Sequence, residues 1–83
     1  MNAEKELGRQ VSEEESALWR EVRRCHLDEP RITVRVTGIG KRLGIHEARV
    51  RQIVRTWDND GLVNAFDNGN QCQLTDYGDG FVF

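Results

Sequence analysis

The sequence predicts a small α+β fold of three helices and a small antiparallel β-sheet, formed by a short strand and a C-terminal hairpin. Three observations support this class. Apolar residues recur with helical spacing in three segments, one stretch alternates polar and β-branched residues, and an Asn-Gly turn signal lies toward the C-terminal end. At 83 residues the chain is expected to form one small domain with a modest core.

The first helix is predicted over about residues 12–26. Ser12, with a glutamate three residues on, forms a capping-box pattern in which the serine accepts from a backbone N–H of the first turn. The glutamates of this turn suit the positive end of the helix dipole. The apolar face consists of Leu18, Val22 and Cys25. The helix is expected to end before Pro30, because proline cannot continue a helix.

A short strand is predicted at residues 31–35, where polar and β-branched residues alternate. A second helix should follow from residue 36 or 37 to residue 43. Gly44 is expected to end it in the left-handed backbone conformation. Gly38 and Gly40 lower the propensity of this helix, so packing must support it. Their spacing does not extend to a dinucleotide-binding motif, and close helix packing is the favoured explanation.

The third helix is predicted over about residues 46–59, closed by the turn-forming residues 59–61. Its apolar face consists of Val50, Ile53, Val54 and Trp57. At about 100° per residue, the opposite side carries Ala48, Gln52 and Arg55, flanked by Arg49, Arg51 and Thr56. Two helices joined by a tight turn at Gly44 and Ile45 would therefore present the basic outer side of the second helix.

A C-terminal hairpin is predicted from residues 62–66 and 71–75. Between them, Asp67-Asn68-Gly69-Asn70 favours a type I′ turn, because Asn-Gly tolerates positive φ angles. The predicted organisation of the chain is therefore a domain at 12–78, preceded by an N-terminal arm at 1–11. The sequence leaves open whether this arm is flexible. An apolar tail at 79–83 follows the domain, and the tail either packs on the protein's own core or joins a subunit contact.

The net charge of -2 conceals an uneven distribution. Residues 17–57 carry ten basic and four acidic side chains, whereas residues 58–83 carry five aspartates and no basic residue. Residues 1–16 are also acidic. Because nucleic-acid binding depends on where charge lies, the basic block is compatible with a DNA partner. The excess of arginine over lysine, ten to two, fits bidentate contacts to phosphate or guanine, and equally a GC-rich genome.

Three motifs, in this order, resemble the winged helix-turn-helix family, in particular MarR-like and related prokaryotic regulators. They are "IGKRLGI" (39–45), "VRQIVRTWDNDGLV" (50–63) and "LTDYG" (74–78), and the resemblance covers about residues 32–78. It implies a winged helix-turn-helix fold and a small transcriptional regulator, a repressor that binds double-stranded DNA. The first ten residues lack the apolar stretch of a secretory signal, so a cytoplasmic location is expected. The third helix would enter the major groove, which admits one α-helix.

The resemblance also assigns roles to individual residues. The positions that match the base-reading surface are His46, Glu47, Ala48, Arg49 and Gln52. The positions expected at the DNA backbone are Arg35, Thr37, Lys41, Arg42, Arg51 and Arg55. The wing residues that could make neutral contacts are Asn68, Asn70 and Gln71. For His46, near the helix start, capping of the helix is the alternative role.

The chain departs from the family at two places. Its wing, residues 64–73, contains Asp67 and no arginine or lysine, so the hairpin stays off the DNA, contacts it through neutral groups, or serves another partner. The long terminal dimerisation helices of the family also have no counterpart, although a homodimer stays compatible with the sequence. The alternative function is a winged-helix module for protein–protein contact through the acidic wing or apolar tail. The DNA interpretation requires the arginines of residues 46–56 to face solvent rather than the protein's own carboxylates.

Other classes of function find little support in the sequence. No Ser/His/Asp arrangement has a recognisable spacing, so an enzyme is not expected, nor is a cofactor. Cys25 and Cys72 lie far apart, outside any CxxC motif, which argues against a zinc site and favours unpaired thiols. No apolar run approaches the ~20 residues of a membrane span, so no membrane association is expected.

Overall fold

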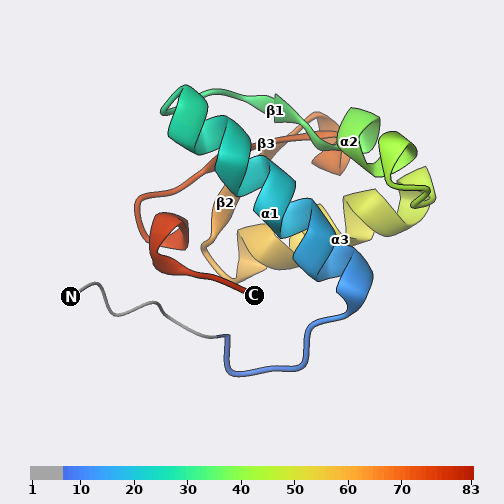
Figure 1. The fold of residues 1–83 in the computed structure, drawn as a ribbon, viewed down its shortest axis with the longest axis horizontal. Helices are drawn as coiled ribbons and strands as arrows, with labels where there is room; N and C mark the ends of the chain where they lie inside the picture. Colours follow the sequence, from blue (N-terminus) through green and yellow to red (C-terminus); the bar gives the residue numbers. More distant parts are fainter. Residues whose placement is uncertain (1–6) are drawn as a thin grey trace.

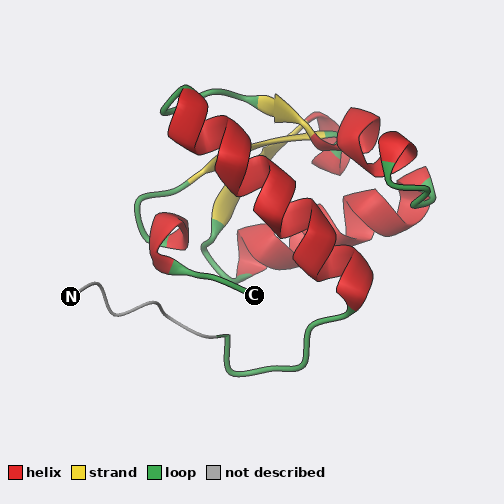
Figure 2. Ribbon diagram, viewed as in Figure 1, coloured by secondary structure: helices red, strands yellow, loops and turns green. Residues whose placement is uncertain are grey.

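The computed structural model describes residues 7–83, and the first six residues of the predicted N-terminal arm lie outside the described part (Figure 1). Within it, three α-helices accompany one three-stranded antiparallel sheet, which confirms the predicted α+β class. The helices are α1 (Glu13–Asp28), α2 (Val36–Arg42) and α3 (Glu47–Asn59). The strands are β1 (Val34–Arg35), β2 (Val63–Phe66) and β3 (Gln71–Leu74), in the spatial order β1-β3-β2. In Figure 2 the strands lie together beside the helices.

Helix α1 begins as predicted and ends two residues later than predicted. Ser12 Oγ accepts a hydrogen bond from the backbone N–H of Glu15 at 3.1 Å, which confirms the serine half of the capping box. The carboxylate of Glu15 does not reach back to the helix start. It is buried and points toward α3 instead. At the other end, the N–H of Glu29 still donates to Cys25 O at 3.0 Å, so the helix continues to Asp28.

Strand β1 is shorter than the predicted strand at residues 31–35. Arg31 has a φ of 68°, which places it in the left-handed region rather than in extended backbone. Its carbonyl accepts from the side chain of Gln73 at 2.6 Å, and the N–H of Ile32 donates to Glu29 O in a turn. The first half of the predicted strand is therefore a turn that brings the chain from α1 to β3, where Val34 lies opposite Cys72.

The connection between α2 and α3 is a tight left-handed cap, as predicted. Gly44 has a φ of 76° and donates to Lys41 O at 3.2 Å. The N–H of the next residue, Ile45, donates to Gly40 O at 2.8 Å. These two bonds form a Schellman motif, which satisfies carbonyls that a helix end otherwise leaves free. The side chain of Ile45 is buried, so the turn is anchored to the core.

Gly40 of α2 packs closely against Val50 of α3, and the expected role of this glycine in helix packing is confirmed. A Cβ atom built on Gly40 would overlap a methyl group of Val50, a side chain that is fully buried and cannot move aside. A Cβ built on Gly38 meets only the aliphatic stem of Arg35, at 3.9 Å. The two glycines of α2 therefore have different structural roles.

The substitution Gly40→Ala is expected to destabilise the protein by about 1–2 kcal/mol, since overpacking typically costs ~1–3 kcal/mol and the gain in helix propensity returns up to ~1 kcal/mol. Gly38→Ala, in the same helix, should be neutral or stabilising because it brings the propensity gain without the overlap. Urea unfolding of both variants measures the difference. Equal stabilities for the two variants would contradict the packing assigned to Gly40.

The hairpin turn lies at residues 67–70, as predicted, and its Asn-Gly pair has the features of a type I′ turn. Asp67, Asn68 and Gly69 all have positive φ angles, of 51°, 56° and 89°, so the Asn-Gly pair does adopt the left-handed region. The N–H of Asn70 donates to Asp67 O at 3.0 Å, which closes this turn. β2 and β3 pair as far as Phe66 and Gln71, the strand ends that the sequence predicts. The carbonyl of Asn70 accepts from the first N–H groups of α2, so the turn is tied to that helix.

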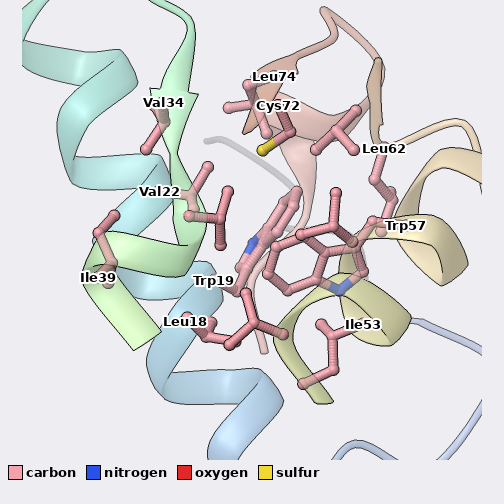
Figure 3. Close-up of a cluster of buried hydrophobic side chains, with 14 of the residues drawn as sticks. Leu18, Trp19, Val22, Val34, Ile39, Ile53, Trp57, Leu62, Cys72 and Leu74 are labelled. Atoms are coloured by element: carbon pink, nitrogen blue, oxygen red, sulfur yellow. The ribbon is translucent and has the colours of Figure 1, made fainter. Parts of the chain in front are cut away.

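Two tryptophans form the centre of the core (Figure 3). The rings of Trp19 on α1 and Trp57 on α3 pack edge to face, with centroids 5.0 Å apart. From the tail at residues 79–83, Phe83 stacks on Trp19 at 4.8 Å, and Phe81 is buried and accepts from Trp19 Nε1 through its carbonyl at 2.9 Å. The tail therefore packs on the protein's own core, the first of the two alternatives.

Candidate nucleic-acid interface

The outer side of α3 forms a ridge in solvent, as the periodicity predicts. Val50, Ile53, Val54 and Trp57 are buried behind it. The residues at the top of the ridge, Ala48, Gln52 and Arg55, are exposed, and the flanking residues Arg49, Arg51 and Thr56 are half-buried. Of the three arginines, Arg55 has no hydrogen bond or ion pair among residues 7–83, so it is free to meet a ligand.

Different segments border the two flanks of this ridge. On the Arg49 side, the chain before α1 and the first turn of α1 form a groove of about 670 Å³ with α3. On the other side, the hairpin loop packs against the backbone of Arg51, where a Cβ on Gly69 would lie 3.0 Å from Arg51 O. The hairpin loop therefore lies alongside α3 rather than extending away from it.

Two of the three arginines on α3 contact carboxylates of the protein itself, contrary to the expectation that they face solvent alone. Arg49 Nε lies 3.6 Å from Glu14 Oε1, and Arg51 Nη1 lies 3.5 Å from Glu47 Oε2. Both distances exceed the ~2.7–2.9 Å of a strong charge-assisted hydrogen bond. The two glutamate side chains are 51% and 66% exposed. Exposed pairs contribute about 0–1 kcal/mol, so a phosphate or a base edge could displace them.

Several other cations near α3 have no carboxylate partner within residues 7–83. They are Arg35, Lys41, Arg42 and Arg55, and all four side chains are exposed. Arg35 is the N-cap of α2, and Lys41 and Arg42 form its last turn. Thr37, also predicted at the DNA backbone, is half-buried at the start of α2. Arg35 ends β1, and the others come from α2 and α3, which pack against each other.

At the start of α3, two predicted base-contacting residues are engaged in local contacts. His46 is the N-cap, and its Nδ1 accepts from the backbone N–H of Ala48 at 3.1 Å. The capping alternative for His46 is therefore confirmed, while its Nε2 is left for other partners. Glu47 is exposed in the first turn and pairs with Arg51, one turn along the helix. Both side chains lie at the end of α3 that the resemblance places nearest to base edges.

The three residues predicted to contact DNA from the wing differ in how far their side chains are exposed to a ligand. Asn68 is exposed at the tip of the loop. Asn70 is half-buried: its carbonyl accepts from the N–H groups of Val36 and Thr37, and its side-chain Oδ1 accepts from Arg51 at 3.5 Å. Gln71 is half-buried within β3. The principal role of Asn70 is therefore to tie the hairpin loop to α2 and α3.

A buried polar network, which the sequence patterns did not predict, joins the N-terminal segment to α1 and α3. The carboxylate of Glu15 accepts from Trp57 Nε1 at 2.8 Å and from both terminal nitrogens of Arg9, at 2.9 and 2.6 Å. Arg9 also contacts Asp60 at 3.1 Å, and the hydrogen bonds to Glu15 raise the pKa of Arg9 further above its usual range. One signal was available: Glu15 precedes Leu18 by three residues and so lies on the apolar face of α1.

Three other features of the described part of the chain bear on function: the arrangement of metal-binding side chains, the state of the cysteines and the apolarity of the helices. No group of three or more histidine, cysteine, aspartate or glutamate side chains is arranged to hold a metal ion within residues 7–83. Cys25 and Cys72 are free, and burial raises the pKa of the Cys72 thiol to about 12, so that it is protonated at neutral pH. None of the helices in residues 7–83 has the length and apolarity needed to cross a bilayer.

Comparison of the chain with protein-family models, with curated proteins and with solved structures finds no match in any of the three sets.

Proposed function

We propose that this protein is a small winged helix-turn-helix regulator that binds double-stranded DNA in a sequence-specific manner, with α3 in the major groove. It would act as a repressor by occupying an operator, without carrying out a reaction. In this proposal α2 and α3 form the helix-turn-helix unit, and the β2–β3 hairpin is the wing. The element order of the described chain supports this assignment, because a strand, two tightly connected helices and a hairpin follow α1 in turn.

The observation that carries the proposal is the solvent-facing ridge of α3 together with its Arg55 and the Lys41 and Arg42 of α2, which are unpaired within residues 7–83. A helix of 13 residues is about 20 Å long, and one helix fits the major groove, which is ~12 Å wide. The buried back of α3 holds it rigidly on the core, while Gln52 and Arg55 project from its outer side. The exposed cations of α2 and α3 could then neutralise phosphates on either side of the groove.

Substitution of two arginines should separate base reading from phosphate binding. Arg49→Ala is expected to weaken binding to the preferred sequence by about tenfold or more and to change binding to random DNA little, because a bidentate base contact is worth ~1–3 kcal/mol. Arg55→Ala should weaken binding to all sequences alike and reduce the slope of log K against log[salt] by about 1. Selection of bound fragments from random DNA, followed by salt titration, measures both effects.

Arg31→Asn is the matched control for these variants. Arg31 is exposed, has no carboxylate partner within the described residues, and lies in the turn before β1 rather than on α2 or α3. Asparagine is chosen because it tolerates the left-handed backbone of this position. The substitution lowers the net charge by the same amount and should leave DNA affinity close to that of the unmodified protein. If all three variants retained DNA equally, the major-groove assignment of α3 would be wrong.

A second function, a winged-helix module for protein–protein contact, is favoured by the exposed aromatic residue at the end of the hairpin. Phe66 is 45% exposed and stands beside the acidic Asp67. An exposed aromatic residue next to a negative charge fits a protein surface better than a phosphate backbone. Loss of a protein partner on Phe66→Ser, with no effect of Arg49→Ala or Arg55→Ala on DNA retention, would support this alternative.

A further inference from the structure

Arg49 is fully engaged by the protein itself before any ligand is bound. Its Nε lies 3.6 Å from Glu14 Oε1, its Nη1 donates to Gln52 Oε1 at 3.2 Å, and its Nη2 donates to Ser12 Oγ at 3.4 Å. Each nitrogen of the guanidinium group therefore has a partner. Two of these partners come from the beginning of α1, 35 or more positions away in the sequence.

A bidentate contact to guanine uses two guanidinium nitrogens at once. A guanidinium group offers two edges for such a contact, Nη1–Nη2 and Nε–Nη2, and on Arg49 both nitrogens of either edge already have partners on the protein. The Nε–Nη2 edge includes the nitrogen that faces Glu14. A carboxylate competes directly with a nucleic-acid acceptor, since both are anionic or electron-rich groups that accept from the same donors. The energy needed to separate Arg49 from Glu14 is then subtracted from the energy gained on DNA.

We propose that Glu14 is an autoinhibitory residue for DNA binding: it holds Arg49 in the free protein and lowers the affinity for DNA until the contact is exchanged. The inference rests on the proposed function of α3. The contact is long and exposed, so it lowers the affinity for DNA without preventing binding. It gives the acidic first turn of α1 a role beyond its favourable position at the helix dipole.

Glu13 offers a matched control in the same helical turn. It is exposed like Glu14 and lies in the same first turn of α1, and it lines the same groove as Arg49, but its side chain has no ion pair or hydrogen bond with Arg49 or another cation within residues 7–83. Glu13→Gln and Glu14→Gln remove the same charge from nearly the same place. General repulsion of DNA and the loss of helix-dipole stabilisation are therefore shared by both variants, and only the specific contact distinguishes them.

Binding to the best selected DNA fragment should be measured near 0.15 M salt, where charges separated by more than ~8 Å are largely screened. Glu14→Gln is expected to bind about threefold more tightly than Glu13→Gln, the change that an exposed ion pair can supply. When Arg49→Ala is added to each variant, the two should bind equally. Glu14→Gln also loses this ion pair in the free folded protein, so its thermal unfolding midpoint should lie about 3–5 °C below that of Glu13→Gln.

Equal binding by Glu14→Gln and Glu13→Gln would overturn the autoinhibitory role while leaving the DNA-binding proposal intact. A Glu14→Gln advantage that persisted after removal of Arg49 would also overturn it, because the effect would then not pass through the guanidinium group. If the unmodified protein and every variant failed to retain DNA, the proposed function itself would be contradicted. The autoinhibitory role of Glu14 would then be contradicted as well.

Discussion

Replacement of Gly78 by alanine should reduce the stability of this protein more than any other single-methyl change. A Cβ atom at this position would overlap the carbonyl oxygen of Leu62 and would lie 2.8 and 2.9 Å from the carbonyl carbon and Cα of the same residue. These are backbone atoms, so no side-chain rotation can relieve the overlap. The expected cost is about 3 kcal/mol or more, at the upper end of overpacking effects.

The local hydrogen bonds explain why the backbone around Gly78 cannot yield. The N–H of Thr75 donates to Leu62 O at 3.0 Å, and its hydroxyl donates to Gly61 O at 2.7 Å, with Leu62 O also 3.0 Å away. The same hydroxyl accepts from the N–H of Gly78 at 2.9 Å. Separation of the chains at this point would break these bonds and would loosen the burial of Leu62 and Phe81. The close approach of the Leu62 backbone therefore explains why glycine, and no larger residue, fits position 78 of the Leu-Thr-x-x-Gly motif.

Circular dichroism melts of Gly78→Ala and Gly8→Ala provide the measurement and its control. A Cβ atom on Gly8 would have no neighbouring heavy atom within 4 Å, and the φ of Gly8 lies outside the left-handed region, so its substitution should be silent. A loss of 3 kcal/mol corresponds to a fall in Tm of about 12–24 °C for a domain of this size. A Gly78→Ala protein that melts within a few degrees of the unmodified chain would contradict the close approach to Leu62.

Replacement of Arg9 by alanine should cost about 2 kcal/mol, although Arg9 lies outside the domain that the sequence predicts. Its removal leaves the Glu15 carboxylate, in a residue only 5% exposed, with Trp57 Nε1 as its remaining donor. Loss of one partner of a fully buried ion pair costs ~3–5 kcal/mol, and the 33% exposure of the Arg9 side chain reduces this figure, because water can partly replace it.

A double-mutant cycle tests the cause of this loss. Glu15→Gln removes the charge but keeps an oxygen that can accept from Trp57, so Arg9→Ala added to Glu15→Gln should cost much less than Arg9→Ala alone. Stabilities from urea unfolding at neutral pH give the coupling energy. If the two substitutions were additive, the network would not be a unit, and the N-terminal segment would be held by other contacts such as that of Leu7 with the core.

The sequence by itself was sufficient for the elements and for the faces of the helices. The spacing of Val50, Ile53, Val54 and Trp57 predicted the buried side of α3, and Gly44 predicted the end of α2, because helical period and left-handed caps depend on near neighbours in the chain. The first strand deviated from its predicted bounds: Arg31 adopts the left-handed region, and its carbonyl accepts from the side chain of Gln73, which is distant in the sequence.

Only the tertiary structure decided which charges are free. Periodicity gave Arg49, Arg51 and Arg55 the same outward side, but it could not tell that the first turn of α1 lies beside Arg49 while Arg55 has no partner in the described chain. In the same way, Glu15 lies 42 positions before Trp57 of α3, and Arg9 lies 51 positions before Asp60, the C-cap of that helix. Such pairings follow from the angle at which helices cross and the path of the chain ends, which no local pattern contains.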